Sequence, residues 1–275
     1  MSPRLQTASQ DILSGANVRH ADELISLGDA AVRLADRLSA LDLFGRLAAV
    51  RSAIAGRIVF TTSFGLEDQA VAHAIFVQHL AIDIVTLDTG RLFPETHQVW
   101  AETERRYGRR IHAIVPEHAQ VEAFVGRHGI DGFRASVEAR HACCGVRKVA
   151  PLGRALNGAA AWITGLRAEQ SAERADIRFA ALDPVHRLIK VNPLLDWTRS
   201  RLADFVHLHH IPYNALHDRG FPSIGCAPCT RAVEPGEPER AGRWWWEQEE
   251  KKECGLHSRL VSPADAPASP PLSHS

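Results

Sequence analysis

The sequence has no long apolar run and no excess of charge of either sign, and these two absences narrow the classes of protein that it can encode. Nowhere do its 275 residues contain the roughly 18 consecutive apolar residues that a membrane-spanning helix needs. The formal net charge is +0 at pH 7, so no global field draws the chain onto nucleic acid or an anionic membrane. Any anion that it binds must therefore meet a local cationic pocket.

The chain also lacks a secretory leader and the even number of cysteines that is typical of a disulfide framework. Residues 1–17 mix charged and polar side chains with short apolar stretches. Five cysteines in a chain of this length fit reduced thiols, metal ligation or catalysis better than disulfides. We therefore expect a cytoplasmic protein.

Strand-like and helical segments alternate through the middle of the chain. Strands are predicted over Arg57–Thr62, Ile82–Leu87, Ile111–Val115, Ala160–Thr164 and Leu188–Val191, and helices over Glu67–His79, Glu95–Tyr107 and Trp197–His209. This order predicts an α/β fold, a mostly parallel twisted sheet with helices on both faces. Ligands of such sheets bind at the carboxyl ends of the strands, so the loops there are the places to look for chemistry.

The two ends of the chain differ from this middle part. Apolar residues recur at helical spacing over Ala21–Ile54, which predicts one or two amphipathic helices. Ser262–Ser275 is rich in Pro, Ser and Ala, and we expect it to be disordered. The predicted organisation is an N-terminal helical lead-in (1–56), an α/β domain (57–250) and a mobile C-terminal segment (251–275).

Four of the cysteines form two pairs, Cys143-Cys144 and Cys226-Ala-Pro-Cys229. A C-x-x-C spacing lets two thiolates converge on one metal centre, although alone it also fits a zinc half-site or a redox dithiol. Adjacent thiols are hard to explain as packing, because buried cysteine is usually single. The spacing is equally compatible with a four-thiolate zinc site and a [4Fe-4S] cluster.

The fifth cysteine, Cys254, stands apart from both pairs. Lys251, Lys252 and His257 lie close to it in the sequence and would favour its thiolate. A reactive nucleophile is one interpretation, and a spare surface thiol is the other.

Three predicted strand ends carry residues suited to an anionic ligand. Ser63 to Asp68 leads into a helix, whose free backbone N–H groups favour phosphate or sulfate. Leu87-Asp88-Thr89-Gly90 follows the second strand, where an ordinary capped turn is an equal alternative. Gly165-Leu166-Arg167 follows a later strand, and Arg174 is nearby, so two guanidinium groups could bind an anion there. Two further arginines, Arg240 and Arg243, precede three tryptophans, Trp244 to Trp246. The tryptophans are interpreted as helix packing in preference to base stacking.

Together these residues resemble the assimilatory sulfonucleotide reductases, and specifically the bacterial and plant-type adenylyl-sulfate (APS) reductases. The resemblance runs from about Arg57 to His257. Its most specific parts are Cys143-Cys144-Gly145-Val146-Arg147-Lys148, Cys226-Ala-Pro-Cys229-Thr230-Arg231 and Glu253-Cys254-Gly255-Leu256-His257.

The resemblance implies an adenine-nucleotide α-hydrolase-like fold, a [4Fe-4S] cluster on Cys143, Cys144, Cys226 and Cys229, and catalysis by Cys254. The loop at Ser63 to Asp68 departs from the Ser-Gly-Gly-x-Asp-Ser form of ATP-cleaving relatives, so ATP pyrophosphatase activity is not expected. The implied substrate-binding residues fall on the strand-end loops and the later cations: Ser63, Gly65, Leu87, Asp88, Thr89, Gly90, Lys148, Gly165, Arg167, Arg174, Arg240, Arg243 and His257.

In the implied reaction Cys254 attacks the sulfur of APS, AMP leaves, and thioredoxin or glutaredoxin releases sulfite from an S-sulfocysteine, as a step of sulfate assimilation toward cysteine. Relatives suggest a homo-oligomer. The alternatives are a reductase of the 3′-phosphorylated nucleotide (PAPS) or of both nucleotides, and a non-catalytic zinc-stabilised nucleotide-binding module. A nucleotide-dependent enzyme that thiolates tRNA is a more distant one.

Overall fold

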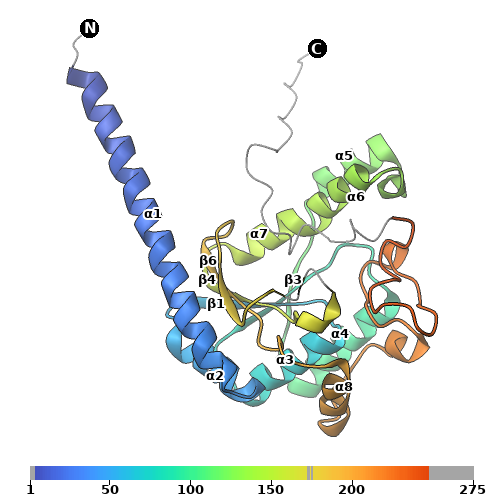
Figure 1. Cartoon of the computed structure of the whole chain (residues 1–275). Coiled ribbons are helices and arrows are strands. Elements are labelled where there is room, and N and C mark those ends of the chain that lie inside the picture. Colours follow the sequence, from blue (N-terminus) through green and yellow to red (C-terminus); the bar gives the residue numbers. More distant parts are fainter. Residues whose placement is uncertain (1–3, 172–173, 175, 248–275) are drawn as a thin grey trace.

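Six strands form one sheet in the order β3-β2-β1-β4-β6-β5. The computed structural model describes residues 4–171, 174 and 176–247, and the sheet occupies its centre (Figure 1). The strands are β1 (Arg57–Thr62), β2 (Asp83–Leu87), β3 (His112–Ile114), β4 (Ala159–Ile163), β5 (Ala180–Asp183) and β6 (Leu188–Val191). Every pairing is parallel except that of β5 with β6. The predicted mostly parallel sheet is therefore confirmed.

Helices cover both faces of the sheet. They are α1 (Arg4–Ser39), α2 (Leu43–Ala53), α3 (Leu66–Val77), α4 (Pro94–Tyr107), α5 (His118–His128), α6 (Val137–Cys144), α7 (Ala150–Leu156) and α8 (Arg199–Leu208). The break between α1 and α2 falls at Asp42, whose carboxylate accepts a hydrogen bond from Gly45 N at 2.8 Å and caps α2. Helix α1 begins at Arg4, well before the periodic segment from which helices were predicted, and its N-terminal part extends away from the sheet (Figure 1).

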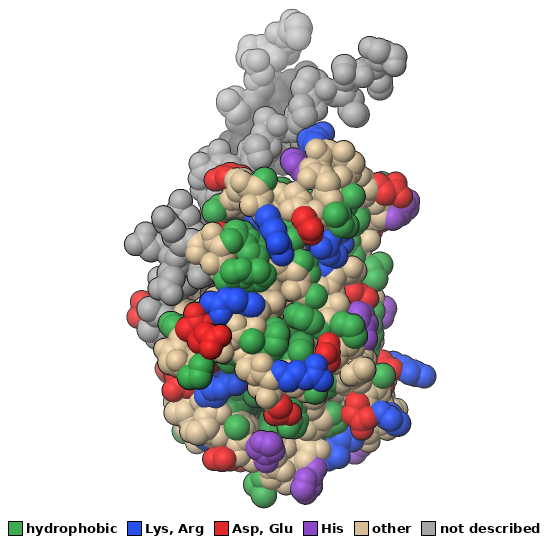
Figure 2. All heavy atoms as spheres, turned by 90° about the vertical axis from the view of Figure 1, so that its right-hand side faces the viewer, with side chains coloured by type: hydrophobic (Ala, Val, Ile, Leu, Met, Phe, Trp, Pro, Cys, Tyr) green, Lys and Arg blue, Asp and Glu red, His purple; other side chains and the backbone are tan. Residues whose placement is uncertain are grey.

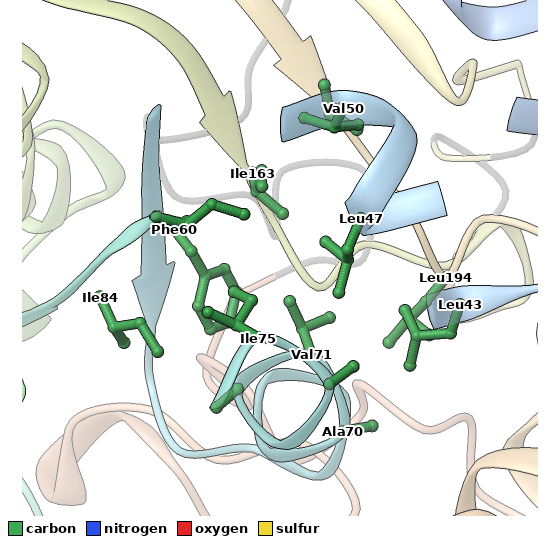
Figure 3. Close-up of a cluster of buried hydrophobic side chains, with 14 of the residues drawn as sticks. Leu43, Leu47, Val50, Phe60, Ala70, Val71, Ile75, Ile84, Ile163 and Leu194 are labelled. Carbon is green, nitrogen blue, oxygen red and sulfur yellow. The ribbon is translucent and has the colours of Figure 1, made fainter. Parts of the chain in front are cut away.

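The alternation of side chains along the strands divides the core into two layers. In β1, Ile58 and Phe60 join the large cluster with α2 and α3, whereas Val59 between them faces the opposite side. Figure 3 shows Phe60 packed toward α3, with Ile84 of β2 nearby. On the opposite face Val59 packs with side chains of α7. Both faces are apolar, as a parallel sheet that is covered on both sides requires.

Strand β5 was not predicted from the sequence. It has four residues and lies at the sheet edge, where it pairs antiparallel with β6 through a turn at His186 and Arg187. Asp183 stabilises this turn, because its carboxylate accepts hydrogen bonds from Val185 N at 3.0 Å and His186 N at 3.1 Å. Its sequence, Ala-Ala-Leu-Asp, contains no β-branched or aromatic residue and therefore carries no strand signal.

Charges of both signs are interspersed on the surface. Figure 2 shows Lys and Arg side chains beside Asp and Glu side chains over one face of the molecule. This mixture agrees with the net charge of +0. Within the described ranges, no helix is long and apolar enough to cross a bilayer.

His73 of α3 is buried and should make stability depend on acidity. Burial, followed by the neighbouring His209 and Arg106, lowers the pKa of His73 from 6.5 to about 4. The folded state therefore binds fewer protons than the unfolded state between these values, so stability is complete above pH 6.5 and falls as the pH drops toward 4. The ring Nδ1 of His73 lies 2.8 Å from Tyr107 Oη, so the neutral imidazole has a hydrogen-bond partner.

We expect His73→Phe to reduce the slope of the unfolding free energy against pH between pH 6.5 and pH 4. One histidine can contribute at most about 1.4 kcal/mol per pH unit to this slope. Urea denaturation of both proteins at several pH values measures it. Parallel slopes in the two proteins would show that His73 does not titrate in this range.

Candidate active site

A cavity of about 190 Å³ lies at the carboxyl ends of β1, β2 and β4. The three strand ends contribute Thr61 to Ser63, Thr86 with Leu87, and Thr164 with Gly165. Of the predicted substrate-binding residues, those that line this cavity are Ser63, Gly65, Leu87, Thr89, Lys148, Gly165, Arg174, Arg240 and Arg243. The structure thus brings most of them together at one edge of the sheet, where ligands of such folds bind.

The first loop turns sharply between β1 and α3. Phe64 has a φ of 62°, in the left-handed region that non-glycine residues rarely adopt. Its buried ring stacks on Trp100 of α4, with 5.6 Å between the ring centroids, and Phe64 N donates to Thr62 Oγ1 at 3.0 Å. These contacts hold the strained turn that directs Ser63 and Gly65 at the cavity.

Asp68 is a buried carboxyl group inside this anion-suited loop. Its Oδ2 accepts hydrogen bonds from Ser63 N at 2.6 Å and Ser63 Oγ at 2.8 Å. Burial outweighs these bonds and raises the pKa of Asp68 from 3.8 to about 7, with a further contribution from Glu67. A β-carbon at Gly165 would lie 2.3 Å from Asp68 Oδ1, so glycine is required there. Around neutral pH the charge of the cavity therefore depends on Asp68.

Asp88 and Gly90 lie beside the cavity, and neither belongs to its lining. Asp88 Oδ1 accepts a hydrogen bond from Gly90 N at 2.9 Å, and Gly90 has a φ of 68°. Arg147 donates to Thr89 O at 2.6 Å and fixes the same turn. In this arrangement Asp88 and Gly90 shape the loop that presents Thr89.

Arg167, expected among the substrate-binding residues, is held by carboxylates instead of lining the cavity. Its side chain is 0% exposed and forms ion pairs with Glu67 at 2.8 Å, Glu169 at 2.9 Å and Glu239 at 2.9 Å. The pair with Glu239 ties the loop before Arg240 and Arg243 to the end of β4. Arg167 thus positions the loop that leads to Arg240 and Arg243, and the three carboxylates compensate its own charge.

Four thiols line a second cavity beside the first. Cys143 and Cys144 end α6, and Cys226 and Cys229 bound a short 3₁₀ turn, Ala227–Cys229. After Cys144 the helix widens into a π-helix, Gly145–Val149, before α7 begins, which is a device often found at functional sites. Lys148 and Arg243 line both cavities. The same cations therefore face the thiols and the strand-end pocket.

The thiols differ in their proton affinity. Burial raises the pKa of Cys229 to about 12, with a further contribution from Cys226. At Cys226 burial acts in the same direction, but Lys148, the Thr89 hydroxyl group at 3.3 Å and Arg243 outweigh it and lower the pKa. The site therefore favours thiolate at Cys226, whereas Cys229 needs further positive charge to ionise.

The four thiols have the chemistry of a metal centre but are not arranged as one. In residues 4–171, 174 and 176–247, no group of three or more His, Cys, Asp or Glu side chains has the geometry of a metal-ion site. None of the four described cysteines forms a disulfide bond, all four line one cavity, and Lys148 and Arg243 beside them would offset the charge of bound thiolates. The chemistry of the donors suits zinc or an iron-sulfur cluster.

Several lining residues were not anticipated from the sequence: Glu67, Asp68, Gln170, His217 and Glu239. Among them only Glu67 and Asp68 have a sequence signal, as an acidic pair at the start of α3. That position also suits an ordinary helix N-terminus. The tryptophans were expected in a helix, but Trp244 lies buried in a turn with a φ of 42°. Cys254 and His257 lie outside the described residues.

The sequence from residue 57 to 232 matches the phosphoadenosine phosphosulfate reductase domain. The chain belongs to this reductase family. Two curated relatives are named adenosine 5′-phosphosulfate reductase. The protein from Sinorhizobium fredii (strain USDA 257) is 56% identical over 84% of this chain and 92% of its own length. That from Allochromatium vinosum is 51% identical over 78% of this chain and 84% of its own length.

The fold of this family member agrees with a solved structure. Phosphoadenylyl-sulfate reductase from Candida auris, in a phosphate complex, superposes with a TM-score of 0.63 at 24% identity, covering 74% of this chain and 96% of that one. At this identity the likeness concerns the fold alone. Together with the sheet topology it confirms the predicted adenine-nucleotide α-hydrolase-like architecture.

Asp68 should give the reductase pocket a pH-dependent affinity for an adenine nucleotide such as AMP. Below pH 7 its carboxyl group is neutral, and above pH 7 it is an anion that repels the phosphate. We expect Asp68→Asn to remove this repulsion, so that the ratio of wild-type to variant Kd for AMP rises about three- to tenfold from pH 6 to pH 8.5. Calorimetric titration measures both constants. A ratio that stays constant with pH would contradict the role of Asp68.

Proposed function

We propose that the chain is an adenylyl-sulfate reductase that converts APS to sulfite and AMP in sulfate assimilation. The observation that carries the proposal is the pair of adjoining cavities, one at the strand ends and one lined by four thiols, with Lys148 and Arg243 in the walls of both. Relatives that are 51–56% identical over most of the chain bear the same activity in their names. Lys148, Arg174, Arg240 and Arg243 in its wall supply positive charge that suits an anionic nucleotide, beside the carboxyl groups of Glu67, Asp68 and Glu239.

Cys254 is the proposed nucleophile. Its thiolate would attack the sulfur of APS, the S–O bond to the phosphate would break, and AMP would leave with the electron pair of that bond. The product on the enzyme is S-sulfocysteine. One thiolate of thioredoxin or glutaredoxin then attacks the Cys254 sulfur, and sulfite departs with the electron pair of the S–S bond. The second thiol of the reductant attacks the resulting mixed disulfide, which releases the Cys254 thiolate and leaves the reductant as a disulfide.

The cations of the cavity supply the electrostatic part of this reaction. Lys148, Arg174, Arg240 and Arg243 line the cavity and would surround a phosphosulfate group, with His257 as a further proposed contact. Their charges offset the repulsion between a thiolate and an anionic substrate, and they stabilise the phosphate as it leaves. Each should therefore affect rate as well as binding.

The proposed cofactor is a [4Fe-4S] cluster held by Cys143, Cys144, Cys226 and Cys229. When bound it would supply a compact negative charge beside Lys148 and Arg243, and the thiol chemistry needs no electron from it. Positive metal charge would also ionise Cys229, whose pKa is otherwise about 12. Thiols and a dithiol reductant stay reduced in a reducing compartment, so the proposal includes a cytoplasmic location.

The remaining parts of the proposal concern organisation. The helical residues 1–56 would act as a lead-in layer, 57–250 would bind nucleotide and cluster, and 251–275 would carry the nucleophile. A homo-oligomer is part of the proposal by resemblance only. Substrate choice between APS and PAPS depends on the 3′ position of the nucleotide, and the names of the relatives favour APS.

Cys254→Ser tests the activity. We expect anaerobically purified wild-type protein, incubated with APS and no reductant, to release one AMP per active site and gain a sulfonate adduct at Cys254 by mass spectrometry. The variant should form no adduct and lose at least about 10³-fold in turnover with thioredoxin, because it lacks the nucleophile. Full turnover by the variant would overturn the proposal, and faster reaction with PAPS in a parallel assay would reassign the substrate.

Cys229→Ser tests the metal centre. We expect the wild-type protein to be brown and to contain iron and acid-labile sulfide, and the variant to lose both because one of four ligands is gone. Absorption near 400 nm and metal analysis measure this outcome. A colourless wild-type protein with one zinc per chain would instead favour the zinc-stabilised module.

A further inference from the structure

A buried ion pair joins α6 to the last described residue of the chain. Arg140 Nε and Nη2 donate to the two carboxylate oxygens of Glu247 at 2.8 and 2.9 Å. The side chains are 0% and 4% exposed. A two-point pair of this kind fixes both position and orientation, and within protein it is screened little by salt.

Trp244 holds the same cation from another side. The Arg140 guanidinium carbon lies 4.6 Å from the centroid of the Trp244 ring, and that of Arg243 lies at the same distance. Trp244 N donates to Cys229 O at 3.2 Å, and Glu247 N donates to Trp244 O at 2.8 Å. The turn from Trp244 to Glu247 is therefore fixed by charge, ring stacking and backbone bonds together.

This anchored turn lies against the thiol cavity. Arg140 precedes Cys143 and Cys144 by three and four residues, so the three share one face of α6. Arg140, Arg243 and Trp244 all line the cavity that holds the four thiols. The chain thus continues beyond Glu247 from a point fixed beside the centre and beside Arg243 of the substrate pocket.

Cys254 follows Glu247 by only seven residues. A fully extended chain of that length spans at most about 25 Å. The place where Glu247 is held therefore limits where the thiol can go, and a short tether raises its effective concentration at a nearby site.

We propose that the Arg140–Glu247 ion pair is the anchor from which the Cys254 thiol works, which makes Arg140 and Glu247 positioning residues for the transfer step. This inference rests on the proposed function, because it assigns a role relative to the proposed nucleophile. It adds that the helix bearing two of the cluster thiols also fixes the base of the segment that carries the nucleophile.

The test separates positioning from chemistry by single-turnover kinetics. We expect Glu247→Ala and Arg140→Ala each to lower the rate of sulfonate formation at Cys254, at saturating APS, about 10- to 100-fold. Affinity for AMP, iron content and the rate of Cys254 alkylation by iodoacetamide should stay within about twofold of wild type, because pocket, centre and thiol remain. The double variant should be no slower than either single variant, since one anchor is lost in each case.

Matched variants control for simple loss of an ion pair. Arg231 and Glu237 form another two-point pair, with both contacts at 2.8 Å, in the same part of the chain. Glu237→Ala should leave the transfer rate unchanged. Arg140→Lys keeps the charge but cannot make the two-point contact, so its transfer rate should fall between those of the wild type and Arg140→Ala.

Removal of one partner leaves a buried charge and can unfold the protein, so the apolar pair Arg140→Leu with Glu247→Leu provides a second route. We expect this variant to fold with its iron and still transfer slowly, because leucines pack without a fixed orientation. An unchanged transfer rate in the variants, or a loss that follows iron content or AMP affinity, would overturn the anchor. Absence of a Cys254 adduct in wild-type protein would instead overturn the proposed function.

Discussion

A positive charge buried in protein must be compensated, and the loops at the carboxyl edge of the sheet are arranged around that requirement. Arg167 meets three carboxylates, Arg140 meets Glu247 and the face of Trp244, and Lys148 and Arg243 stand between thiols and the strand-end cavity. These carboxylates hold Arg167 and Arg140 in place. Lys148 and Arg243 line both cavities and would face groups that become anionic when thiols ionise or a phosphosulfate binds.

The sheet could be predicted from the sequence because its signal is local. The segments over Arg57–Thr62 and Leu188–Val191 agree residue for residue with β1 and β6, since both are short, mostly buried runs rich in apolar and β-branched residues. Strand β5 was not predicted because Ala-Ala-Leu-Asp contains no β-branched or aromatic residue, so its pairing with β6 decides its conformation. The early start of α1, at Arg4, was not predicted either.

The site could be predicted only as far as residue type and strand end allow. Ser63, Thr89 and Gly165 follow from their places after strands. The role of Arg167 could not be predicted, because one of its partners, Glu239, lies 72 residues away and is brought near only by folding. The convergence of two cysteine pairs on one cavity was implied by family resemblance, and spacing alone left zinc and iron equally open. The π-helix after Cys144 has no marker in the sequence beyond Gly145.

We propose that Lys148 and Arg243 serve both an adenine nucleotide and a four-thiolate iron centre. A crystal structure of the anaerobic protein with AMP, with anomalous data collected on both sides of the iron and zinc edges, tests it most directly. We expect iron density among Cys143, Cys144, Cys226 and Cys229, and the AMP phosphate facing Lys148 and Arg243. Zinc at the thiols, or a nucleotide bound away from these two cations, would contradict it.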